Sequence, residues 1–122
     1  MINLPIFRAF SETFDKYILG VPYFSDGRYY MLVDDCNKNN NIGSGSYPID
    51  ETTLSIHFPD MLDSKGNKIF ASLQEDGKGG DIMQDDEYFG IAKYKDCQFV
   101  VEYEDCIDNI DNGNFEVIGI KQ

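Results

Sequence analysis

Apolar and polar residues alternate along much of this chain, as they do in β-strands that have one face toward a core. The clearest case is residues 52–58, where one face carries three apolar side chains and the other carries Thr53, Ser55 and His57. Pro59 then ends the predicted strand. We therefore expect the face with His57 to point toward solvent or to lie at the rim of a sheet.

Strand-like segments rich in β-branched and aromatic residues follow at intervals. They are residues 28–33, 88–94, 98–104 and 115–120. The pairs Asp26-Gly27, Lys95-Asp96 and Asn112-Gly113 lie between segments and have the composition of tight turns. Asn-Gly is a strong hairpin signal because both residues tolerate positive φ. The sequence thus predicts a hairpin between 98–104 and 115–120.

Two further segments are read less directly. Apolar residues in 7–18 fit helical spacing, but the same stretch also reads as two short strands around a polar turn, and the pattern leaves both alternatives open. Residues 34–48 are rich in Asn, Gly and Ser and have no period, which predicts a mobile loop.

The sequence as a whole predicts one domain, 1–122, of mainly β class. It would be antiparallel, with a small, strongly curved sheet or barrel in the C-terminal half, because short strands must close or pack to hide their edges. An α+β variant with one short helix stays open because of residues 7–18. The length of 122 residues and the 42% of hydrophobic residues suffice for a core.

Charge narrows the range of partners. The net charge is −12, of which −1 falls in residues 1–48 and −11 in residues 49–122. Such a chain repels phosphates, so we expect no direct nucleic-acid binding and no docking on anionic membranes. No apolar run approaches the length of a membrane span and the N-terminus lacks a secretion signal, which predicts a cytoplasmic protein.

Candidate chemistry is sparse. The three cysteines (Cys36, Cys97 and Cys106) form no C-x-x-C pair, which favours reduced thiols over a disulfide framework or a zinc site. His57 is the single histidine and no catalytic motif surrounds it. Residues 105–116 fail the EF-hand pattern because Ile110 stands where a ligand belongs. We therefore predict no catalytic residue, no metal ligand, no cofactor and no enzymatic activity.

The glycine-rich segment 68–82, KIFASLQEDGKGGDI, resembles a phosphate loop only superficially. Lys78 is followed by Gly79 where a P-loop needs Ser or Thr, a strand-like segment replaces the helix, and two nearby aspartates would repel an anion. We interpret the segment as a structural loop that returns the chain to the sheet. Gly66, in the preceding segment, is predicted at the tip of another turn.

Several motifs in this order resemble the YopX-like proteins of phages, prophages and mobile elements. They are IFRAF near the start, DMLDSKGNKIF followed by GGDIM, FGIAKYKDCQFVVEYED, and a closing FEVIGI. The likeness is strongest over 54–120. It departs from the family at Phe10, where tryptophan is usual, at Ile120, where asparagine is usual, and in a longer glycine-rich loop.

The resemblance implies a mainly β fold, an origin in a phage or mobile element and a bacterial host cell, and it brings no catalytic residues. In this interpretation Gly80 and Asp81 are turn residues: Gly80 supplies an unusual backbone angle and Asp81 accepts backbone N–H bonds. We expect a non-enzymatic accessory protein that binds a host or phage protein. The alternative is an acidic DNA mimic that blocks a host nucleic-acid-binding factor. Exposed aromatic strands could also pair between copies, so a homo-oligomer stays open.

Overall fold

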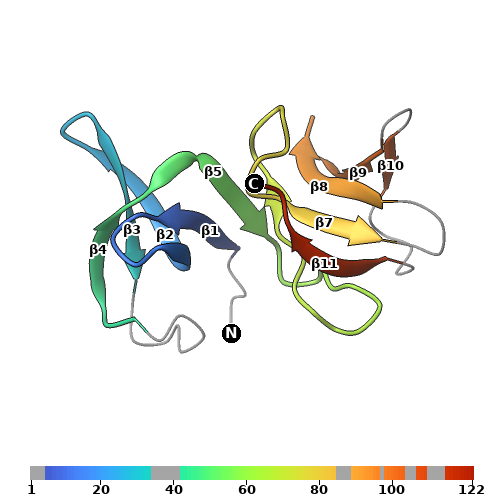
Figure 1. Ribbon diagram of the computed structural model, residues 1–122, viewed down its shortest axis with the longest axis horizontal. Helices are drawn as coiled ribbons and strands as arrows, with labels where there is room; N and C mark the ends of the chain where they lie inside the picture. Colours follow the sequence, from blue (N-terminus) through green and yellow to red (C-terminus); the bar gives the residue numbers. More distant parts are fainter. Residues whose placement is uncertain (1–4, 34–41, 85–88, 97, 104–106, 110–114) are drawn as a thin grey trace.

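The computed structural model describes residues 5–33, 42–84, 89–96, 98–103, 107–109 and 115–122. All regular secondary structure in these residues is β-strand, and the eleven strands join in one strongly curved sheet (Figure 1). The predicted mainly β, antiparallel class is confirmed, and the described residues contain no short helix.

The first five strands form an N-terminal lobe. They are β1 (Ile6–Ser11), β2 (Lys16–Ser25), β3 (Arg28–Val33), β4 (Gly45–Pro48) and β5 (Asp50–His57). Their order in the sheet is β5-β1-β2-β3-β4, and all pairs are antiparallel. Because β4 leads directly into β5, the chain crosses from one side of this curved lobe to the other at Ile49.

The remaining strands form a C-terminal lobe. They are β6 (Ala71–Ser72), β7 (Asp81–Gln84), β8 (Phe89–Lys95), β9 (Gln98–Glu102), β10 (Ile107–Asn109) and β11 (Glu116–Ile120). Strands β6, β8, β9 and β10 continue the sheet from β5, and β7 pairs with both β8 and β11. The pairing of β6 with β8 is the one parallel contact between the described strands.

The segment 7–18 resolves as strands. Strand β2 pairs with β1 over its first half, up to Gly20, and with β3 over its second half, from Val21 onward. This exchange of partners bends β2 and starts the curvature of the lobe. The predicted Asp26-Gly27 turn is confirmed: both residues have positive φ, 53° and 76°, as a two-residue type I′ hairpin needs.

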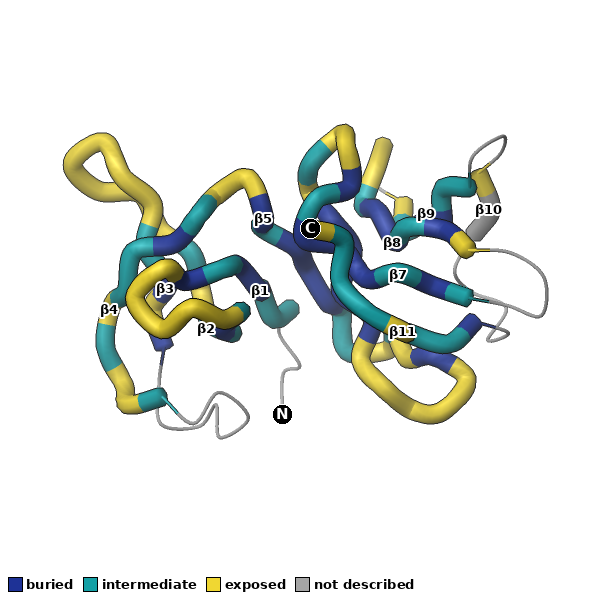
Figure 2. The backbone as a smooth tube through the Cα atoms, viewed as in Figure 1, coloured by how far each residue is buried: buried dark blue, intermediate teal, exposed yellow. Residues whose placement is uncertain are grey.

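Strand β5 runs between the two lobes, and its residues from Thr53 to His57 are buried or half-buried (Figure 2). It pairs with β1 on one edge and with β6 on the other. Thr53, Ser55 and His57 are at most 2% exposed, so the prediction that this face points to solvent or to a rim is wrong. A period of two separates the faces of a strand but does not say which of them another layer covers.

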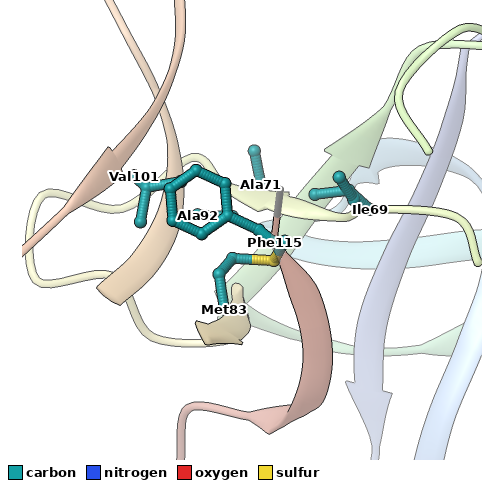
Figure 3. Close-up of a cluster of buried hydrophobic side chains, with 6 residues drawn as sticks. All are labelled: Ile69, Ala71, Met83, Ala92, Val101 and Phe115. Atoms are coloured by element: carbon teal, nitrogen blue, oxygen red, sulfur yellow. The ribbon is translucent and has the colours of Figure 1, made fainter. Parts of the chain in front are cut away.

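Each lobe has its own hydrophobic core. The N-terminal core consists of Ala9, Ile18, Met31, Val33 and Ile49. The C-terminal core consists of Ile69, Ala71, Met83, Ala92, Val101 and Phe115, and the Phe115 ring lies at its centre (Figure 3). Five of these eleven side chains come from the predicted strands 28–33, 88–94, 98–104 and 115–120: Met31, Val33, Ala92, Val101 and Phe115.

Two local predictions need correction. Part of the loop predicted at 34–48 is ordered as β4, because Gly45–Pro48 pairs with β3 over Tyr30–Val33; residues 34–41 lie outside the described residues. The hairpin predicted between 98–104 and 115–120 does not form, because β9 pairs with β8 and β10, whereas β11 pairs with β7. The intervening strand β10 occupies the edge of β9 that β11 would have needed.

Candidate functional site

His57 lies at the junction of the lobes and is 2% exposed. Its Nδ1 is 3.0 Å from the carbonyl oxygen of Ile69, so Nδ1 carries the proton and donates to that oxygen. Burial lowers the pKa of His57, the charge of Lys68 adds to the lowering, and the bond to Ile69 opposes it. The neutral imidazole, bonded to this backbone carbonyl, ties β5 to the segment that precedes β6.

The glycine-rich loop is packed between the lobes. Gly79 has φ +82°, and a Cβ atom there would come within 1.9 Å of the Thr53 carbonyl oxygen. Gly80, by contrast, does not have the unusual backbone angle that was predicted for it. A larger residue does not fit at position 80, because a Cβ atom would lie 2.4 Å from the Ala92 carbonyl oxygen. The loop thus lets the backbones of the two lobes meet directly.

Asp81 is the first residue of β7 and is 1% exposed, so its predicted role as a turn residue is wrong. Its Oδ1 accepts a hydrogen bond from the Arg8 guanidinium at 2.7 Å, and its Oδ2 accepts one from the Phe70 N–H at 2.8 Å. The predicted acceptance of a backbone N–H does occur. Burial raises the pKa of the Asp81 carboxyl, and Arg8 and the Phe70 N–H oppose that rise.

Arg8 is the partner that sequence reasoning missed. It comes from β1, 73 residues away from Asp81, and also donates to the Gly79 carbonyl oxygen at 2.8 Å. Its guanidinium carbon lies 4.5 Å from the centre of the Phe70 ring and 5.5 Å from that of Tyr17. The one available signal was a charged residue in the otherwise apolar IFRAF stretch. The Arg8–Asp81 ion pair fastens the first strand to the C-terminal lobe.

The other predicted turn residues divide in two groups. Gly66 has φ +83° and its N–H donates to the Asp63 carbonyl oxygen, as in the predicted turn. Asp63 fastens that turn to β11, because its carboxylate accepts the backbone N–H groups of Lys65, Asn67 and Val117. Asn112 and Gly113 lie outside the described residues, and so do the three cysteines.

Among the described residues, no three acidic, histidine or cysteine side chains come together in a group that could hold a metal ion. In the same part of the chain no helix is long and apolar enough to cross a membrane.

Many residues of the β2–β3 hairpin are exposed (Figure 2), and one face of the hairpin, which we call the outer hairpin face, carries exposed apolar side chains. This face consists of Val21, Tyr23, Tyr30 and Leu32. Val21 and Leu32 lie directly opposite each other and are 57% and 50% exposed. The rings of Tyr23 and Tyr30 stack beside them with centroids 5.5 Å apart. It is a preorganised apolar surface, because stacked and paired side chains have little freedom left to lose on contact.

The chain matches none of the family models, curated proteins or solved structures with which it was compared. The resemblance to the YopX-like proteins therefore stays a prediction from its motifs.

Proposed function

We propose that this protein is a non-enzymatic accessory protein that acts by binding another protein, and that the outer hairpin face is its contact surface. The observation that carries the proposal is the exposure of Val21 and Leu32, paired across β2 and β3, beside the stacked Tyr23 and Tyr30. Contiguous apolar patches on soluble domains mark interaction sites, and tyrosines are enriched where partners bind.

The placement of the buried polar groups supports a non-enzymatic role. His57 donates to a backbone carbonyl and Asp81 is neutralised by Arg8, so each of these groups has a structural partner. Perturbed pKa values also arise in structural networks, and here the partners account for them. The resemblance to YopX-like proteins adds an origin in a phage or mobile element, a bacterial cytoplasm, and a host or phage protein as the partner.

Affinity capture tests the proposal. The tagged full chain is incubated with a lysate of the bacterium that carries the gene, at low and at moderate salt. A double variant, Val21→Thr with Leu32→Thr, places a β-branched side chain at both positions and replaces apolar atoms with a hydroxyl at each. The matched control, Leu62→Thr with Ile118→Thr, changes two other side chains of similar exposure, 46% and 47%.

We expect a partner that the wild type and the control retain at both salt concentrations and that the hairpin variant loses. Equal retention by both variants would contradict the assignment of the hairpin. A complex that moderate salt dissolves and that the hairpin variant still forms would instead favour the DNA-mimic alternative, since salt screens contacts between exposed charges.

A further inference from the structure

A hollow of about 660 Å³ opens beside the hairpin, next to Ile49 of the N-terminal core and apart from the ion pair at the junction. Three segments line it: the turn after β1, the turn between β2 and β3, and the crossing from β4 to β5. Strong curvature of the lobe brings these segments together. The hollow is concave, which suits it to enclose a side chain better than a flat sheet does.

The lining is acidic. It contains the three carboxylates of Glu12, Asp50 and Glu51 against one base, Arg28. Asp50 is held in place, because its Oδ1 accepts the N–H of Thr52 at 3.0 Å and the Thr52 hydroxyl at 2.6 Å. These bonds favour the charged form of the carboxylate.

Lys78 approaches the other oxygen of Asp50 at 3.8 Å and offsets part of its charge. Glu12 and Glu51 are exposed. The balance of the lining therefore stays negative and complements a cation.

One aromatic side chain belongs to the lining as well. Tyr29 lines the hollow, is 38% exposed, and packs against Phe24 with ring centroids 4.9 Å apart. A ring face attracts a guanidinium or ammonium group. Tyr29 is the chain neighbour of Tyr30, and because successive side chains of a strand point to opposite faces, the hollow and the outer hairpin face lie on opposite sides of β3.

The charge and the ring in the lining limit which kinds of molecule can occupy the hollow. Phosphates are repelled by the three carboxylates. A bare metal ion is disfavoured, because no three acidic side chains among the described residues group closely enough to hold one. A second copy of the chain brings another net charge of −12 toward the first. An extended organic cation beside an apolar group fits both the charge and the ring.

We infer that the hollow binds a lysine or arginine side chain of the partner protein whose apolar residues cover the outer hairpin face on the other side of β3. The inference rests on the proposed function and specifies the partner: it presents a basic residue to the hollow in addition to the aliphatic or aromatic residues that contact the outer hairpin face. Carboxylates and Tyr29 select the cation, and the hairpin supplies apolar contact area.

The test uses two short probes that differ only in charge. One is the peptide acetyl-Val-Arg-Val-Arg-Val-amide, and the other carries citrulline in place of each arginine, which keeps the shape and removes the charge. Each is titrated into the isotope-labelled full chain while backbone amide resonances are followed. We expect the arginine peptide to shift the amides of Thr13, Gly27 and Asp50 and to bind about tenfold more tightly than the citrulline peptide.

Variants separate the hollow from the overall charge. Glu12→Lys with Glu51→Lys should weaken the arginine peptide about tenfold, and Tyr29→Leu about threefold. The matched control, Asp60→Lys with Glu75→Lys, makes the same change in net charge at exposed acids that do not line the hollow. Equal weakening by the two double variants would overturn the inference, as would equal affinity for the two peptides or no shift at millimolar peptide.

The two proposals fail in different ways. If the hairpin variant loses the lysate partner while Glu12→Lys with Glu51→Lys changes neither that partner nor the arginine peptide, protein binding stands and the basic-residue inference falls. If the hollow selects the arginine peptide but the hairpin variant keeps its lysate partner, the inference holds for the hollow and the assignment of the hairpin falls.

Discussion

The junction between the lobes and the β2–β3 hairpin are unusual in opposite ways: the junction buries charged side chains, and the hairpin exposes apolar ones. At the junction a charged pair, Arg8 and Asp81, lies inside the protein at 10% and 1% side-chain exposure. On the hairpin, apolar Val21 and Leu32 are half exposed. Soluble domains normally bury apolar side chains and expose charged ones.

The difference teaches which departure the fold itself needs. The buried charges have partners inside the chain, including the Gly79 carbonyl and the Phe70 N–H, and of this pair the Arg8 Nε alone lacks a hydrogen-bond partner among the described residues. Val21 and Leu32, by contrast, are not covered by any other part of the chain that the structure describes. Substitutions at the junction should therefore change stability, whereas substitutions on the hairpin should change association.

The largest effect is expected from Asp81→Ala. It leaves the Arg8 guanidinium buried without its carboxylate, which should lower the free energy of unfolding by about 3–5 kcal/mol. The control is Glu116→Ala, which removes the exposed ion pair with Lys65 and should cost less than about 1 kcal/mol. Urea unfolding measures both. Similar losses in the two variants would mean that Arg8–Asp81 does not fasten the lobes.

Gly79→Ala should come next. It combines a positive φ with a clash against the Thr53 carbonyl, and we expect a loss of about 3 kcal/mol. Gly27→Ala is the matched control, because Gly27 has nearly the same φ but nothing within 4 Å of its added Cβ. That variant should lose about 1–2 kcal/mol, the backbone part alone. Equal losses would argue against close packing of the loop on β5.

A smaller effect concerns pH and His57. Its pKa lies below the ordinary 6.5 in the folded protein, so the unfolded chain takes up a proton more readily. Its contribution to stability is present above pH 6.5, declines as the pH falls from there, and is lost once the pH has passed the folded pKa. Asp81, with a raised pKa, has the opposite slope.

The comparison is therefore made between the wild type and His57→Gln by denaturant unfolding at a series of pH values. The stability difference between the two should shrink as the pH falls below 6.5. Since His57 is the single histidine, a difference that stays constant would mean that His57 titrates alike in the folded and unfolded chain.

The smallest effect on stability is expected on the hairpin. Val21→Thr with Leu32→Thr should change the free energy of unfolding by about 0.5 kcal/mol or less at each site. The same variant is expected to abolish partner capture. A large destabilisation would show that the outer hairpin face belongs to the folded core and would remove the contrast with the junction.

Some local signals in the sequence predicted the local structure correctly. Asp26-Gly27 has the two positive φ angles that its turn type requires, and segment 28–33 coincides with β3. Such features depend on residues close together in the chain, so composition and alternation suffice.

Contacts between distant residues escaped prediction. The burial of His57 depends on layers from both lobes, and the role of Asp81 depends on Arg8 in another strand. The pairing of β11 with β7 likewise could not be predicted from a turn signal. A turn signal does not show whether the edge of the preceding strand is free to pair or is already occupied by another strand. The outer hairpin face was foreseen only as aromatic strands suited to contacts. Which of their side chains are exposed depends on the curvature of the sheet.

The 73 residues between Arg8 and Asp81 also bear on how the chain is made. At a synthesis rate of about 5–20 residues per second, Asp81 is added to the growing chain roughly 4–15 s after Arg8. During that interval β1 has no counter-ion, so the emerging N-terminal half cannot settle into its final arrangement. A nascent chain arrested before Asp81 should be digested readily by protease, and one arrested well beyond the last strand should resist.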